Sequence, residues 1–202
     1  WPVYAETCPH YLSKTDAAYG AEDESEVIRS VISPPLRSEA DRQALWLGVA
    51  HSGLDVVASD HVPDRLAVEK AVPAPPFPQI SNGAPGIETL LAVTYSTGPG
   101  AGRVSLERMV DVLSTTPARL FGLETKGTVE AGKDADLVLF DPTVSRTVTQ
   151  ESLHHTSDFT PYEGTQLRGA VRTVLLRGEP VVREGLFVGR RGRGRFLERR
   201  LA

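Results

Sequence analysis

Residues 54–61 decide the fold, and they read Leu54-Asp55-Val56-Val57-Ala58-Ser59-Asp60-His61. The apolar centre of this stretch predicts a buried strand, and the strand runs into a polar tip that carries a carboxylate. A helical pattern precedes it over residues 42–51, opened by Ser38 as the N-cap and closed by Gly53. An earlier apolar run, residues 3–7, predicts another strand. A strand, a helix and a second strand in this order favour parallel β/α units.

Residues 61–86 are rich in proline and glycine and follow directly after the strand-end acid. Loops in this position often form active-site lids. Beyond the loop, helices are predicted over residues 87–95, 106–113 and 116–122. The last of these has a proline in its first turn and a glycine at its end.

The pattern changes after Gly122 to short apolar runs separated by turn residues, which is typical of a small β module. The predicted strands are residues 127–132, 135–140, 171–176, 180–183 and 186–188. Residues 190–202 form a tail with six arginines and one glutamate. We therefore divide the chain into residues 1–121, 122–189 and 190–202.

Composition excludes several classes of protein. The net charge of −4 over 202 residues gives no electrostatic reason to expect a nucleic-acid partner. No apolar run approaches the ~20 residues that span a bilayer, so no membrane partner is expected. The single cysteine, Cys8, excludes an internal disulfide and fits a reducing compartment, which predicts a cytoplasmic location. The chain opens inside a predicted strand without methionine, so we expect a fragment of a longer protein.

Asp60 is the sharpest candidate for a functional residue. A carboxylate at the C-terminal end of a parallel strand stands where barrel enzymes keep their chemistry. It could bind a metal or accept a proton from a metal-bound water, and the alternative is a turn or helix-capping aspartate.

The five histidines lack the spacing that puts two ligands on one metal from a single strand or helix. His10 and His61 lie near strand ends and are candidates. His51 is interpreted as structural, and the pair at residues 154–155 as solvated. A complete metal site cannot be assembled from this sequence.

Three other features allow a functional and a structural interpretation. Cys8 lies at a strand end without an evident basic partner and is interpreted as a small buried residue. The turns at residues 33–35 and 81–83, which contain Ser33 and Asn82, could present backbone groups to a small polar ligand. They could equally be plain turns.

Several motifs, taken in order, resemble dihydropyrimidinases, hydantoinases, allantoinases and dihydroorotases. They occupy residues 5–12, 32–37, 58–61, 81–88, 114–122, 126–137 and 159–164. The resemblance spans nearly the whole chain, and the motifs at 114–122 and 126–137 are shared across the amidohydrolase superfamily. The ending at residues 188–197 looks most like that of dihydropyrimidinases and hydantoinases. In dihydroorotases the strand-end Asp-His pair is often followed by a further histidine that binds a substrate carboxylate. Here Asp64 stands in the matching place and would repel a carboxylate, so this chain resembles dihydroorotases less.

The resemblance implies an α/β fold, the C-terminal part of a (β/α)8 TIM barrel with a β-sandwich. Residues 1–121 would supply the last two barrel strands and residues 122–189 the C-terminal share of the sandwich. Such enzymes hold two divalent metals, usually zinc, with a His-x-His pair, a carboxylated lysine, two more histidines and an aspartate. Only the aspartate maps here, onto Asp60, as metal ligand and proton carrier. Ser33 and Asn82 match positions whose backbone groups hold the cyclic substrate.

The resemblance thus predicts part of a zinc-dependent enzyme that opens dihydropyrimidine or hydantoin rings to N-carbamoyl amino acids. The other ligands would precede this chain, so the isolated chain is expected to be inactive. The full-length protein is expected to be a homotetramer that acts on a small cyclic amide or ureide. Allantoinase and a non-catalytic scaffold related to dihydropyrimidinase are the alternatives. An independent small domain conflicts with the barrel, because two of its strands would expose apolar edges.

Overall fold

The computed structural model describes residues 2–70 and 76–199. Its first half contains β1 (Glu6–Thr7) and β2 (Val56–Val57), which pair in parallel with Glu6 opposite Val56. This pairing confirms the parallel β/α arrangement expected from the sequence. The connection between the two strands carries α1 (Pro9–Ser13), η1 (Asp16–Gly20), α2 (Glu24–Arg29) and α3 (Glu39–Ala50).

The long helix α3 begins where the sequence predicts, at Ser38. The Ser38 hydroxyl accepts a hydrogen bond from the Asp41 amide at 3.3 Å, and the Asp41 carboxylate accepts one from the Ser38 amide at 3.1 Å. This capping box satisfies amides that have no partner within the helix. At the centre of α3, the buried Trp46 donates from Nε1 to the Leu12 carbonyl at 2.8 Å, which fixes α3 against α1.

Helices continue after the loop that follows β2. The predicted helix over residues 106–113 is α5, which runs directly into a π-helical turn and then α6. The full set is η2 (Phe77–Gln79), α4 (Leu90–Thr97), η3 (Pro99–Ala101), α5 (Leu106–Val110), η4 (Asp111–Thr115) and α6 (Thr116–Leu120). Val112 packs with Leu12, Trp46 and Val57 in one core cluster, so these helices cover the β1–β2 pair.

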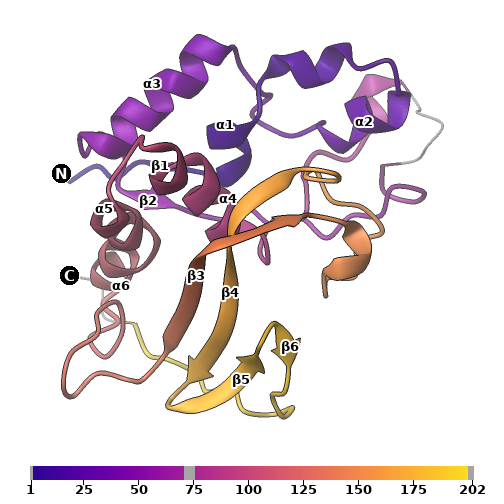
Figure 1. Ribbon diagram of the computed structural model, residues 1–202. Helices are drawn as coiled ribbons and strands as arrows, with labels where there is room; N and C mark the ends of the chain where they lie inside the picture. Colours follow the sequence, from indigo (N-terminus) through magenta and orange to yellow (C-terminus); the bar gives the residue numbers. More distant parts are fainter. Residues whose placement is uncertain (1, 71–75, 200–202) are drawn as a thin grey trace.

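The β module forms an antiparallel sheet in the order β3-β4-β5-β6 (Figure 1). Its strands are β3 (Leu137–Thr147), β4 (Gln166–Leu176), β5 (Glu179–Arg183) and β6 (Leu186–Phe187), with η5 (Gln150–Ser152) between β3 and β4. The predicted strand at residues 127–132 is wrong, because this segment forms turns. Gly127 and Gly132 adopt φ values of +89° and +92°, which lie outside the range of a β-strand.

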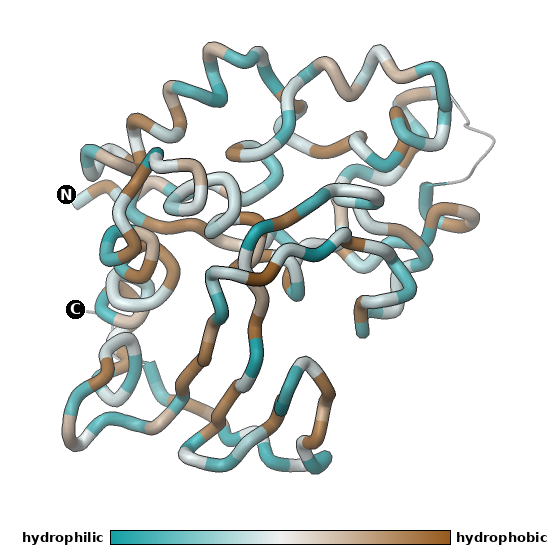
Figure 2. The backbone as a smooth tube through the Cα atoms, viewed as in Figure 1, coloured by the Kyte–Doolittle hydropathy of each residue, from teal (hydrophilic) through white to brown (hydrophobic). Residues whose placement is uncertain are grey.

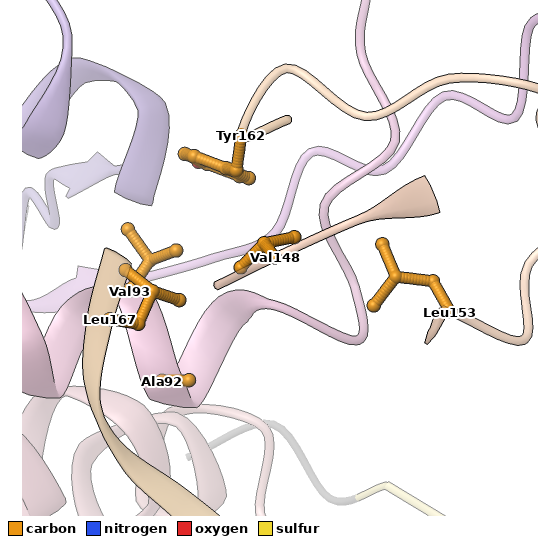
Figure 3. Close-up of a cluster of buried hydrophobic side chains, with 6 residues drawn as sticks. All are labelled: Ala92, Val93, Val148, Leu153, Tyr162 and Leu167. Atoms are coloured by element: carbon orange, nitrogen blue, oxygen red, sulfur yellow. The ribbon is translucent and has the colours of Figure 1, made fainter. Parts of the chain in front are cut away.

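The sheet and the helices share a hydrophobic core. Val148, which follows β3, packs with Val93 of α4 and Leu167 of β4, and Tyr162 closes the cluster (Figure 3). The far end of the sheet is different, because hydrophobic and hydrophilic residues mix along it (Figure 2) and Leu186 and Phe187 are exposed. Within residues 2–70 and 76–199, every helix is too short or too polar to cross a bilayer.

Candidate functional site

Asp60 lies just beyond the C-terminal end of β2, and its side chain reaches the surface. Its backbone has φ +43°, in the left-handed region that few residues other than glycine adopt. Asparagine and aspartate tolerate this region better than other residues, and such conformations cluster at functional sites. Ala58 donates its amide to the Thr7 carbonyl at 2.9 Å, so the ends of β1 and β2 lie side by side.

This pairing brings Asp60 to two residues that follow β1. Cys8, His10 and Asp60 each offer a ligand atom, and these atoms all lie within 4.8 Å of one another. Cys8 and His10 are each only 5% exposed, and Nε2 of His10 is buried with no hydrogen-bond partner in residues 2–70 and 76–199. The structure therefore assembles three groups able to bind one metal, whereas the sequence alone predicted no assembled site. No local spacing could reveal the cluster, because strand pairing creates it.

Burial decides the charge states in this cluster. It lowers the pKa of His10 to about 4, against the opposing effect of Asp60, so the imidazole is neutral at pH 7. It also raises the pKa of the Cys8 thiol to about 12, with the charges of Asp60 and Glu6 adding to the effect. The prediction that Cys8 is buried is confirmed.

The turn that contains Ser33 is held by two tyrosines. Tyr11, the residue after His10, donates its hydroxyl to the Pro34 carbonyl at 2.9 Å. The Tyr19 hydroxyl accepts the Leu36 amide at 2.8 Å. Burial raises the pKa of Tyr11 to about 12, with Cys8, Asp60 and Tyr19 contributing, so this donor keeps its proton at neutral pH. Ser33 itself is exposed, and its turn is anchored to α1 beside the cluster.

The turn that contains Asn82 lies beside the segment leading to Ser33. The Gly83 amide donates to the Val31 carbonyl at 3.1 Å, and the exposed Asn82 donates its side-chain amide to the Ile80 carbonyl at 3.2 Å. Gly83 has φ +141°, and a Cβ on it would lie 2.5 Å from a methyl of Val62. Only glycine therefore fits at this position.

His61 acts as a clamp on the loop after Asn82. Its Nδ1 accepts amides from Gly86 at 3.1 Å and Ile87 at 3.4 Å, which places the proton of the neutral ring on Nε2. The Val62 amide donates to the Ala84 carbonyl at 3.1 Å and extends the same contact. His61 therefore has a structural role: it holds the loop after Asn82 against the strand end that carries Asp60.

The two histidines at residues 154–155 behave differently from each other. His154 is exposed, and its Nδ1 lies 2.8 Å from Glu88. The prediction of a solvated residue is wrong for His155. Both of its ring nitrogens are buried without hydrogen-bond partners among the described residues, and its ring lies 6.3 Å from that of His61. The loop around residue 155 folds back onto the helical half, so local polarity misled the prediction. His51 caps the C-terminal end of α3, in keeping with its structural interpretation.

Sequence reasoning missed Lys70, which lies in the loop after Asp60. Its side chain is fully buried, and Nζ donates to the Val31 carbonyl at 2.7 Å. Burial lowers the pKa of Lys70 to about 8, opposed by the charge of Asp64. Asp64 is itself 9% exposed, which places it under the surface beside this lysine. Residues 71–75 of the predicted lid loop lie outside the described residues.

The residues of this cluster fit a divalent metal. A neutral imidazole, a carboxylate and a thiol that becomes a thiolate on binding are ligand types that zinc accepts. Asp60 supplies the ligand closest to solvent, and the orphaned His10 nitrogen is a buried polar atom that nothing in the described chain satisfies.

Comparison with known proteins identifies the family of the chain. The family model "Amidohydrolase family" matches residues 5–181. The chain belongs to the amidohydrolase family. It is 40% identical over 200 residues to a D-phenylhydantoinase of Escherichia coli (strain UTI89), covering 98% of this chain and 43% of the relative. The chain therefore spans less than half the length of these relatives.

Solved structures of hydantoinases and dihydropyrimidinases also resemble this chain. A dihydropyrimidinase from Brevibacillus agri superposes with a TM-score of 0.95 at 42% identity, covering 100% of this chain and 44% of the other. An L-hydantoinase (dihydropyrimidinase) from Arthrobacter aurescens gives a TM-score of 0.82 at 30% identity over 93% of this chain and 41% of the other. The expected relationship to hydantoinases and dihydropyrimidinases is confirmed, together with a mixed α/β fold that corresponds to part of their structures.

Proposed function

We propose that this chain is the C-terminal portion of a metal-dependent cyclic amidohydrolase that opens dihydropyrimidine or hydantoin rings to N-carbamoyl amino acids. The observation that carries the proposal is Asp60, held in a left-handed conformation at the end of a parallel strand. The identity of about 40% to D-phenylhydantoinase over 98% of the chain supports the substrate class.

In this proposal residues 1–121 contribute the last two strands of a (β/α)8 barrel, and residues 122–189 contribute to a β-sandwich. The tail at residues 190–202 takes part in a homotetramer, and the protein is cytoplasmic. The two metals, proposed to be zinc, would lower the pKa of water and polarise the ring carbonyl. Asp60 would hold one of them, and the remaining ligands would come from a segment preceding this chain.

Asp60 then moves the proton of the reaction. Its carboxylate accepts the proton of the water that adds to the ring carbonyl carbon, and passes it to the ring nitrogen as the C–N bond breaks. The exposed turns of Ser33 and Asn82 offer backbone donors and acceptors that orient the ring. Tyr11 and His61 are positioning residues, because they hold these two turns through the hydrogen bonds described above.

The test compares ring opening by the whole protein and by the 202-residue chain, with dihydrouracil, hydantoin and allantoin as substrates. In the whole protein Asp60→Asn is expected to lower kcat at least about 100-fold, since it removes the proton carrier. The exposed Asp16 provides the matched control Asp16→Asn, which should retain activity. The 202-residue chain is expected to be inactive.

Two outcomes would redirect the proposal. Preferred opening of allantoin would favour an allantoinase, and a whole protein that binds metal but opens none of the three rings would favour a scaffold. Turnover by the isolated chain would contradict the division of the metal site between this chain and a preceding segment.

A further inference from the structure

We propose that Cys8, His10 and Asp60 form a binding site for one thiophilic divalent metal ion, which this chain holds without residues from any other segment. The inference goes beyond the proposed function, because its site needs no preceding ligand and no catalytic step. Its central observation is that the three ligand atoms lie within 4.8 Å of one another at the paired ends of β1 and β2.

An unsatisfied polar atom in the cluster favours a bound ion. His10 is 95% removed from solvent, and its Nε2 has no hydrogen-bond partner in the described chain. Buried polar atoms in native proteins nearly always have a partner, and a bound ion is one of the few partners that can satisfy such an atom. A metal bonded to the ring would remove that cost.

The spacing of the three ligand atoms also favours a metal ion. Ligand atoms in a tetrahedral site with bonds of about 2.0–2.3 Å lie roughly 3.5 Å apart. The widest pair of ligand atoms must therefore approach by at most about 1.3 Å. Asp60 can supply this movement because its side chain is exposed, whereas Cys8 and His10 are held together at the start of α1. The Cys8 carbonyl accepts the Tyr11 and Leu12 amides at 3.1 and 3.2 Å, which fixes that spacing.

The types of ligand atom and the charges around them favour a thiophilic metal. One sulfur, one imidazole nitrogen and one carboxylate oxygen suit Zn²⁺, Cd²⁺ or Co²⁺, whereas Mg²⁺ and Ca²⁺ prefer all-oxygen sites. The carboxylates of Asp60 and Glu6 both place negative potential at the Cys8 sulfur, which favours a cation there. Binding displaces the thiol proton to solvent, so the ion is held by a thiolate. Three protein ligands leave the fourth position to water at the exposed side of Asp60.

The ion would draw on the same carboxylate that the proposed hydrolase uses. A thiophilic metal bound between Cys8 and Asp60 would take one carboxylate oxygen, and excess Cd²⁺ would thereby compete with the proposed role of Asp60. Binding of excess Cd²⁺ at this site is therefore expected to inhibit the proposed ring opening.

The experiment is a Co²⁺ titration of the 202-residue chain under reducing conditions, followed by near-ultraviolet absorbance. Cys8 is the only cysteine, so any thiolate-to-cobalt band reports on it. We expect a band that saturates at one equivalent, is displaced by Cd²⁺ or Zn²⁺, and is insensitive to excess Mg²⁺. Cys8→Ser should abolish the band, and His10→Asn and Asp60→Asn should each weaken binding at least about tenfold. His51→Asn is the matched control, because His51 is exposed at the end of α3.

Absence of the band would overturn the inference, as would a band that His10→Asn and Asp60→Asn leave unchanged, which would mean a thiol acting alone. Circular dichroism checks that each variant folds. Where one does not, the ¹¹³Cd NMR shift of the wild-type complex decides between a mixed sulfur, nitrogen and oxygen set and an oxygen-only set. Ring opening by the whole protein is independent of this result, so either proposal can fail while the other stands.

Discussion

Replacing Lys70 by methionine removes a charge that the fold buries completely. Its Nζ donates a hydrogen bond to the Val31 carbonyl at 2.7 Å and lies 6.0 Å from the centre of the Phe159 ring. Methionine keeps an unbranched side chain of similar length in the same space. The variant therefore isolates the cost of the buried ammonium from the packing of its hydrocarbon part.

The size and sign of the effect follow from the pKa of Lys70, which burial lowers from 10.5 to about 8. A difference of about 2.5 pKa units corresponds to roughly 3 kcal/mol. Between about pH 8 and pH 10.5 the unfolded chain keeps this proton while the folded chain has lost it. The unfolded state then binds more protons, so this group makes the free energy of unfolding rise with pH.

The assay is urea unfolding of the wild type and Lys70→Met at several pH values from 7 to 11 (about one unit apart). The free energy of unfolding of the wild type, minus that of the variant, is expected to increase by about 3 kcal/mol across this range. Arg191→Met removes one exposed positive charge and reports the effect of net charge alone. A flat difference would refute a lowered pKa, and a decreasing one would mean that the attraction of Asp64 outweighs burial.

Substitutions at three further positions test the packing around the site, each by urea unfolding. Trp46→Phe removes the hydrogen-bond donor to the buried Leu12 carbonyl and creates a small void, so we expect the free energy of unfolding to fall by about 2–3 kcal/mol. A change below about 0.5 kcal/mol would contradict the hydrogen bond. Gly83→Ala places a Cβ 2.5 Å from Val62 at positive φ and should cost about 1–3 kcal/mol, whereas an unchanged stability would show that the turn relaxes freely. Ser38→Ala should cost about 1 kcal/mol and Ser38→Thr, which keeps the hydroxyl, much less, and equal losses would argue against the cap.

Much of the fold near the site could be predicted from local sequence. The N-cap at Ser38, the helix after it and the apolar run ending at Asp60 are short-range signals that depend on neighbouring residues. The order of the motifs predicted the family, because seven segments occur in the same order as in hydantoinases, which is improbable by chance. The segment at residues 127–132 shows the limit of this reasoning. Its alternation resembles a strand, yet two glycines at positive φ turn the chain there.

The sequence by itself determined the strand-end position of Asp60 and the turns that carry Ser33 and Asn82, because local patterns encode where strands and turns end. Only the tertiary structure brought Asp60 to Cys8 and His10, since the parallel pairing of β1 with β2 joins residues about fifty positions apart. It also decided the burial of Lys70 and of the ring nitrogens of His155, which lie in segments that read as polar loops. Burial depends on what packs from elsewhere in the chain, and a local pattern does not contain that information.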